Sequence, residues 1–356
     1  MQRRKEGKRE RGKAEFSLCE NSKCLINTTN YSLKKPSFPP SLLLSIKTKS
    51  CFKLICGAGN ENLQEVERLV ALYSAAGCRF FDLAASEEVL VAAQRGLDFS
   101  IPKEQQKDYH FCVSIGTKRD QHVQKAGVNA QKCLNCGKCI DVCPQKAINQ
   151  YFKVVKEKCI GCLACKNVCK HDAIEVYSQN KLIDLSTYKL INLSCIELHA
   201  SDTDEAEVDE IWDYLNENFN GMLSLCIGRK KLSDEKILAR VRRIVERRKP
   251  YTTIIQADGV PMSGVADDYE TTLPAIEMGK LIQSLHLPLY LMLSGGTNSK
   301  TAKLAKQYGV NINGIAMGSY ARKIVKEYIE REDFYENKAI FNASLKIAQN
   351  LINSVS

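Results

Sequence analysis

Half of the cysteines in this chain fall into two runs with the same spacing. The sequence contains 16 cysteines, and eight of them follow the pattern C-x2-C-x2-C-x3-C, twice. Thiolates are strong ligands for iron, and this spacing is typical of chains that hold [4Fe–4S] clusters, each bound by four thiolates. The residues are Cys133, Cys136, Cys139 and Cys143 in the first run, and Cys159, Cys162, Cys165 and Cys169 in the second.

The two runs predict two clusters with interlocked ligands. In two-cluster ferredoxins, the fourth cysteine of each run binds the cluster of the other run. The repeat extends beyond the cysteines, because Val142 and Ala147 recur at the same offset as Val168 and Ala173. This doubled unit favours a ferredoxin-like module over a zinc site or disulfides. The expected sets are Cys133, Cys136, Cys139 and Cys169 for one cluster, and Cys159, Cys162, Cys165 and Cys143 for the other.

Outside this module, short apolar strands alternate with amphipathic helices. Continuous apolar strands between helices indicate a parallel sheet buried on both faces. We therefore predict an α/β fold, a (β/α)8 TIM-like barrel, with a 2[4Fe–4S] ferredoxin-like module inserted after the third strand. An open doubly wound parallel sheet is the alternative, although no G-x-G-x-x-G motif follows any strand. The expected strands are 52–56, 79–84, 110–115, 190–198, 222–227, 252–257, 287–293 and 311–317.

Charge is concentrated at the start of the chain. The net charge is +10, and residues 1–49 hold 12 Lys or Arg against four Glu, without apolar periodicity. This composition predicts a disordered tail, and we expect no specific nucleic-acid partner because no basic stripe with interleaved aromatics follows. The predicted parts are the basic tail at 1–49, the first part of the barrel at 50–127, the ferredoxin module at 128–180, the second part of the barrel at 181–335 and a C-terminal helix at 336–356.

Glycines and small polar residues follow the last two expected strands. In a barrel, chemistry takes place at the carboxyl ends of the strands, and glycines there let backbone N–H groups approach a phosphate. A flavin mononucleotide (FMN) or another phosphate-bearing ligand can bind at such a place, whereas tight turns are the structural alternative. Asp82, Asp258 and His199 are further candidates for acid–base chemistry, although a purely structural role is the alternative for each. The candidate cofactor-binding residues are Gly295, Gly296, Thr297, Gly318 and Ser319.

The remaining cysteines lie mostly in or beside apolar, strand-like runs. A free cysteine in such a run is typically a small buried hydrophobic residue. So many unpaired thiols fit a reducing compartment, and no apolar run is long enough to span a bilayer, so we expect a cytoplasmic protein. These residues are Cys19, Cys24, Cys51, Cys56, Cys78, Cys112, Cys195 and Cys226.

The predicted barrel contains five further motifs: FKLICGAG (52–59), FDLAA (81–85), QADGVPMSG (256–264), SGGTN (294–298) and GIAMGSYARK (314–323). With the ferredoxin-type module between the second and third, these motifs resemble one family, the light-dependent period proteins of cyanobacteria. The resemblance implies an iron–sulfur protein that acts as a redox input to the circadian clock, with clock-associated kinases and regulators as partners. The first cysteine run, CLNCGKCIDVCP, departs from the longer, proline-containing run of family members.

The sequence favours a redox sensor or electron relay that works with a protein redox partner. Residues 130–180 hold eight lysines against four acids, which offsets the negative charge of the clusters and favours their reduced state. The alternative is an iron–sulfur oxidoreductase whose clusters feed electrons to a flavin or other phosphate-bearing ligand in the barrel. A purely structural iron–sulfur scaffold is a third possibility. No catalytic motif identifies a substrate, so we lean toward a protein that is not an enzyme.

Overall fold

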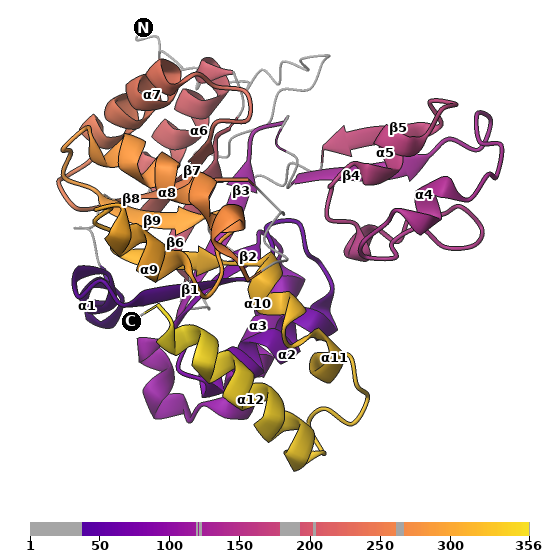
Figure 1. The fold of residues 1–356 in the computed structure, drawn as a ribbon, viewed down its shortest axis with the longest axis horizontal. Helices are drawn as coiled ribbons and strands as arrows, with labels where there is room; N and C mark the ends of the chain where they lie inside the picture. The colour runs from indigo at the N-terminus through magenta and orange to yellow at the C-terminus, as the bar shows by residue number, and fades with distance from the viewer. Residues whose placement is uncertain are drawn as a thin grey trace, which may run out of the picture. The chain divides into compact units, whose positions relative to one another are not determined.

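Eight parallel strands close into a barrel surrounded by helices (Figure 1). The computed structural model describes residues 38–118, 120, 123–178, 193–201, 204–260 and 267–355. Around the barrel the strands follow the order β1-β10-β9-β8-β7-β6-β3-β2, so the first and last strands in the chain pair with each other. The predicted (β/α)8 barrel is confirmed, and the open doubly wound sheet is wrong.

The barrel strands coincide with the eight apolar runs of the sequence. Nearly all of their residues are buried, because side chains on one face fill the barrel and those on the other face lie under helices. The strands are β1 (Cys51–Ile55), β2 (Phe80–Ala84), β3 (His110–Gly116), β6 (Leu193–His199), β7 (Met222–Gly228), β8 (Thr253–Asp258), β9 (Tyr290–Ser294) and β10 (Gly314–Met317).

Amphipathic helices cover the outside of the barrel. Several begin at a capping side chain, such as Asn62 or Asp268, which accepts a hydrogen bond from a backbone N–H of the first turn. None of the helices in the described ranges is both long and apolar enough to cross a membrane. The helices are α2 (Leu63–Ala75), α3 (Glu87–Ser100), α6 (Glu205–Asn218), α7 (Asp234–Glu246), α8 (Tyr269–Gln283), α9 (Thr301–Gln307), α10 (Ser319–Lys323), α11 (Lys326–Ile329) and α12 (Lys338–Asn353), with a 3-10 turn at Lys103–Asp108.

The module is inserted after the third barrel strand, as predicted. Its outer strands, β4 (Gln124–Val128) and β5 (Ile174–Ser178), form an antiparallel pair. This pair begins before the predicted boundary at 128. Between these strands lie α4 (Lys138–Asp141), a 3-10 turn (Lys156–Lys158) and α5 (Ala164–Val168). Because β3 and β6 pair directly, the module is inserted between two strands that are neighbours in the closed barrel.

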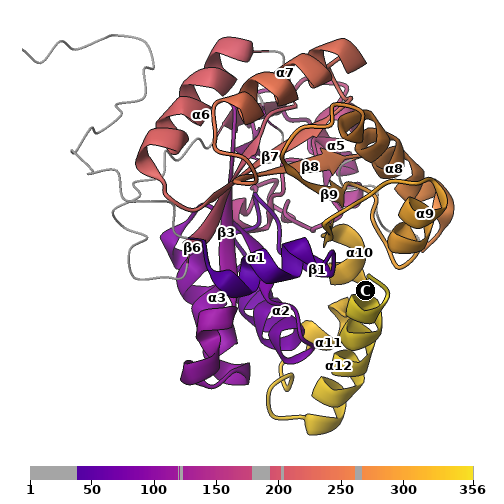
Figure 2. The ribbon, with the colours of Figure 1, turned by 90° about the vertical axis from the view of Figure 1, so that its left-hand side faces the viewer.

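A helix that the sequence did not predict closes the amino-terminal end of the barrel. This helix, α1 (Pro40–Lys47), buries Leu42 and Ile46 against Phe80 and Met222, which begin their strands (Figure 2). The prediction of a disordered tail over 1–49 is therefore wrong for 40–47. The short apolar segment there has a buried partner that only the closed barrel provides. Residues 1–37, with Cys19 and Cys24, lie outside the described residues.

The packing of α1 can be tested with two neighbouring residues of the same helix. Ile46→Ala is expected to lower the free energy of unfolding by about 2–5 kcal/mol, because it leaves a cavity against the strands. Leu44→Ala is the matched control, since Leu44 is 62% exposed, and its effect should stay within about 0.5 kcal/mol. Urea denaturation followed by circular dichroism measures both. Equally small losses would contradict this role of α1.

Candidate functional site

The eight module cysteines lie around two separate hollows. Each hollow takes three thiols from one run and its fourth thiol from the other run, which is the grouping that the spacing predicts. Whether each group holds a [4Fe–4S] cluster stays a prediction. One hollow is lined by Cys133, Cys136, Cys139 and Cys169, and the other by Cys143, Cys159, Cys162 and Cys165.

The backbone around the two hollows repeats as closely as the sequence does. Left-handed residues recur at equivalent places in both runs, and α4 and α5 begin at the same point after each second cysteine. A left-handed residue turns the chain sharply, so three thiols of one run converge on one point. The paired residues are Asn135 and Gly161, Gly137 and Leu163, and Lys146 and Asp172.

Backbone N–H groups point at the sulfur atoms. The N–H of Ala147 donates to Cys143 Sγ (3.2 Å), and the N–H of Ala173 donates to Cys169 Sγ (3.4 Å) in the equivalent place. The Ala173 N–H lowers the pKa of Cys169, whereas burial raises the pKa of Cys165 to about 11. Hydrogen bonds of this kind stabilise thiolates and tune the potential of a bound cluster. The two sets therefore fit [4Fe–4S] clusters in both donor type and surroundings.

The two hollows differ in their exposure to solvent. In the first, Cys136 is exposed and Cys133 is half-buried, whereas in the second, Cys159 and Cys165 are buried. Solvent exposure is one of the factors that set a cluster's potential and its access to partners. The first set is therefore better placed to exchange electrons with another molecule, and the second is better protected.

A cavity of about 90 Å³ lies at the carboxyl ends of the barrel strands. Asp82, Asp258 and His199 line it, which brings the three acid–base candidates together. Gly295 there is left-handed (φ 69°), and a Cβ would lie 2.1 Å from Asp258 Oδ1, so packing alone requires this glycine. A phosphate or flavin in the cavity stays a prediction. All five candidate cofactor-binding residues line it: Gly295, Gly296, Thr297, Gly318 and Ser319.

Next to this cavity, one ammonium group bridges two buried carboxylates. Lys53 Nζ lies 2.9 Å from Asp82 Oδ2 and 2.7 Å from Glu197 Oε2, and all three side chains are almost fully buried. Burial alone would lower the pKa of Lys53, but Asp82 and Glu197 help to raise it well above its usual range. The cost of burying charged groups is offset only where their geometry is close and further hydrogen bonds satisfy their remaining donors and acceptors.

Glu197 receives those further hydrogen bonds. Its Oε2 also accepts from Ser224 Oγ (2.7 Å), and its Oε1 accepts from Gln256 Nε2 (2.8 Å). Burial alone would raise the pKa of Glu197, but Lys53 and His199 hold it well below its usual range. Burial raises the pKa of Asp82, while Lys53 and a hydrogen bond from Ser114 act in the opposite direction.

Both ring nitrogens of His199 face carboxylates. Nε2 lies 3.4 Å from Glu197 Oε1, and Nδ1 lies 3.6 Å from Asp120 Oδ2. Burial alone would lower the pKa of His199, but Cys226, Asp120 and Glu197 raise it well above its usual range. The donor atoms of Glu197, His199 and Cys226 lie within 4.8 Å of one another, as in a metal site. However, Lys53, Ser224 and Gln256 already donate to the Glu197 carboxylate, so the contacts favour a hydrogen-bonded side chain over a metal ligand.

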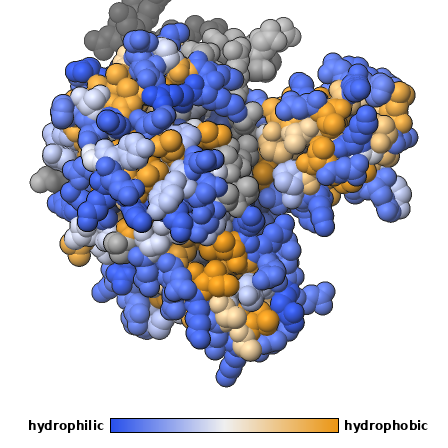
Figure 3. All heavy atoms as spheres, viewed as in Figure 1, coloured by the Kyte–Doolittle hydropathy of each residue, from blue (hydrophilic) through white to orange (hydrophobic). Residues whose placement is uncertain are grey.

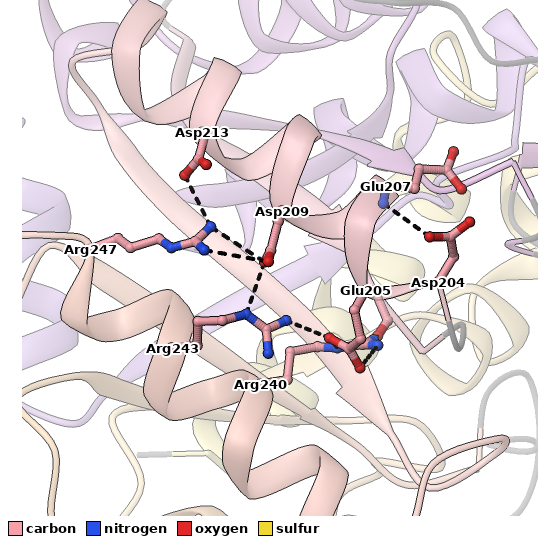
Figure 4. Close-up of polar contacts among 9 residues, drawn as sticks. Asp204, Glu205, Glu207, Asp209, Asp213, Arg240, Arg243 and Arg247 are labelled. Atoms are coloured by element: carbon pink, nitrogen blue, oxygen red, sulfur yellow. Dashed lines mark hydrogen bonds and ion pairs between the residues drawn. The ribbon is translucent and has the colours of Figure 1, made fainter.

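An arginine anchors the end of the strand that carries His199. Arg240 is buried, donates to the carbonyl of Ala200 and pairs with Glu205 at the start of α6 (Figure 4). Further ion pairs continue along the two helices and bind α6 to α7 beside the mouth of the barrel. The further partners are Arg243 and Arg247 of α7 with Asp209 and Asp213 of α6.

Sequence reasoning missed several residues of this site. Lys53 lies inside an apolar strand, and only the barrel shows that its side chain points into the lumen. Arg322 and Ile160 line the cavity, but they come from α10 and from the cysteine module, which the sequence did not connect. The sequence signal for Arg322 was its place in GSYARK, directly after the last strand.

Comparisons with known families agree on the two main parts of the chain. Residues 189–354 match the Light dependent period A C-terminal domain, residues 139–180 match the LdpA Fe-S cluster-binding domain, and residues 126–149 match a 4Fe-4S binding domain. A curated relative, "Light dependent period A" of Synechococcus elongatus, is 27% identical over 328 residues, which covers 83% of this chain and 85% of the relative.

Solved structures with a similar fold are distant. An (S)-3-O-geranylgeranylglyceryl phosphate synthase from Thermoplasma acidophilum is 13% identical, with a TM-score of 0.36, over 86% of this chain and 97% of that chain. A dihydrodipicolinate synthase family protein from Coccidioides immitis is 9% identical, with a TM-score of 0.40, over 88% of this chain and 79% of that chain. Likenesses this weak carry no argument about function.

The buried ammonium can be tested by removing it. Lys53→Met leaves Asp82 and Glu197 buried without their shared cation, so the free energy of unfolding should fall by about 3–5 kcal/mol. The loss should shrink as the pH falls, since protonation of the carboxylates removes the uncompensated charge. Lys103→Met is the control, because Lys103 pairs with Asp98 but is 69% exposed, and about 1 kcal/mol or less is expected. Equal losses measured by urea denaturation would contradict the network.

Proposed function

The chain belongs to the light dependent period A family, and we propose that it carries two [4Fe–4S] clusters and serves as a redox sensor or electron relay. The observation that carries the proposal is the grouping of eight cysteines around two hollows, each with its fourth thiol from the other run. When bound, such clusters supply one-electron redox chemistry. The residues of this chain position the thiolates, donate N–H groups to sulfur and set the local charge.

The charge of the module supports a reducible state. Residues 130–180 hold eight lysines against four acids, and a cluster with four thiolates is anionic. Nearby positive charge makes the uptake of another electron less unfavourable, by Coulomb's law. The module therefore keeps its clusters at potentials that a cellular electron carrier can reach.

The order of electron flow follows from exposure. The first set lies near solvent through Cys136, and Leu134 beside it is 68% exposed. Figure 3 shows hydrophobic residues among hydrophilic ones on the surface of the module. A protein redox partner can dock on such a mixed surface and exchange an electron with the first cluster. The second, more buried cluster then accepts or stores that electron.

The proposal also includes a partner and a biological role. Membership of the family suggests a redox input to the circadian clock, with a clock-associated regulator reading the state of the clusters. A change in cluster charge alters the electrostatics of the module surface, and a docked regulator senses that change. This role requires reversible reduction rather than catalysis.

The oxidoreductase alternative has less support. It needs an FMN or similar acceptor at the barrel mouth, where the cavity in the described part of the chain measures about 90 Å³. Pockets for drug-sized ligands are typically about 300–1,000 Å³. The cavity favours a much smaller ligand than a flavin.

Loss of one thiol tests the number of clusters and the role of Cys136 as a ligand. After anaerobic reconstitution, the wild-type chain should hold about eight irons, and Cys136→Ala should hold about four, because a cube with three thiolates is labile. Cys78→Ser is the control, since Cys78 is buried in the barrel away from the module, and it should keep all the iron. Iron and sulfide analysis gives the result. Unchanged iron in Cys136→Ala would overturn the assignment of the ligands.

A further inference from the structure

The cavity at the barrel mouth has a basic side chain on each of two opposite sides. Arg322 follows β10 and His199 ends β6, and these strands lie opposite each other in the closed barrel. The ring nitrogens of His199 lie 3.4 Å from Glu197 and 3.6 Å from Asp120. Arg322 is 15% exposed, its closest acid is Glu65 at 3.9 Å, and its Nε has no hydrogen-bond partner in the described part of the chain. The Arg322 guanidinium is therefore a weakly compensated charge at a small cavity.

The rest of the lining suits a small anion with a polar group attached. Gly57 lies next to the guanidinium, where a Cβ would lie 3.5 Å from Arg322 Nη1, so the absence of a side chain keeps this side of the cavity open. Asp258 on another wall accepts from Ser294 Oγ (3.2 Å) and can accept from a ligand hydroxyl. A phosphate group at Arg322 and a hydroxyl at Asp258 would use both walls.

One wall of the cavity belongs to the cysteine module. Ile160 lines the barrel cavity and also lines the second hollow, between Cys159 and Cys162 in the chain. A single side chain therefore borders both spaces. A charge bound in the barrel cavity would lie close to the thiolates of the second set.

A buried lysine strengthens this connection. Lys125 Nζ donates to the carbonyl of Gly59, at the cavity, and to the carbonyl of Cys159, both at 2.6 Å. The next residue, Ala126, donates its N–H to Cys159 Sγ at 3.5 Å. A movement of the loop at Gly59 on ligand binding is thus transmitted to the hydrogen bonds of a cluster ligand.

We infer that a small phosphate-bearing anion binds in this cavity and that its binding is coupled to the redox state of the second cluster. The inference rests on the proposed function. The cluster takes up one electron from the redox partner and the anion undergoes no reaction. An anion near the cluster opposes the added negative charge, so binding lowers the midpoint potential. By linkage, reduction weakens the binding of the anion by the same factor. The protein would then respond to a metabolite and to electron supply together.

The test is an anaerobic redox titration of the reconstituted full-length protein, followed by EPR, with and without inorganic phosphate at constant ionic strength. The potential of the second cluster should fall, while that of the first stays unchanged. Cys136→Ala, expected to keep only the second cluster, assigns the shift. Calorimetry should give a phosphate affinity about 5-fold or more tighter for the oxidised than for the reduced protein. Pyrophosphate serves as a second probe.

Variants separate the cavity from general salt effects. Arg322→Gln should abolish both phosphate binding and the shift, and Arg322→Lys should keep part of each. Arg331→Gln is the control, because Arg331 pairs with Asp333 on the surface, and its phosphate effect should equal that of the wild type. This inference alone would be overturned if intact clusters showed no change in potential with either probe. It would also be overturned if Arg322→Gln showed the same shift as the wild type. Protein without reducible clusters would instead overturn the proposed function.

Discussion

The exchange of one thiol between the two cysteine runs is the constraint on which the module depends. Each hollow takes only three of the four thiols of one run and its fourth thiol from the other run, so the two halves must fold together to form either set. The hydrophobic contacts beneath the hollows are few, and the cysteines themselves form part of that small core. In a module of this size, metal ligation commonly supplies the stability that a larger core would otherwise give. We therefore expect iron binding and folding of the module to be coupled.

In the barrel, buried side chains of opposite charge compensate one another. Lys53, Asp82 and Glu197 occupy the lumen as a charged network, while the apolar layers around them provide most of the stability. Replacing such a network with apolar residues often costs little stability, so its place at the base of a cavity points to a positioning role. Its Glu197 carboxylate lies 3.4 Å from His199 Nε2 at the mouth. After the module, the chain re-enters the barrel as β6, which runs parallel to β3 and ends at His199 at the mouth.

Much of this architecture could be predicted from the sequence because its signals are local. Each barrel strand is a short apolar run, and each cluster-binding loop has a fixed spacing of cysteines. The residues that were missed depend on contacts between distant segments. In the sequence, Lys53 is only a polar residue in an apolar strand, and the closed barrel is what brings Asp82 and Glu197 to its ammonium group. The helix at 40–47 lies within a stretch of polar and basic composition, and its apolar face has meaning only against the closed barrel. Arg322 and Ile160 line the cavity from separate segments, and Lys125 donates to the carbonyl of Gly59 in the cavity lining.

The most direct measurement is an EPR spectrum of the anaerobically reconstituted, dithionite-reduced protein, with spins and iron counted on the same sample. Two neighbouring cubes should give about two spins and about eight irons per chain, with spectral features of magnetic interaction between the spins. One spin with about four irons would contradict the two-cluster account. A sample without any low-temperature signal would contradict the redox role altogether.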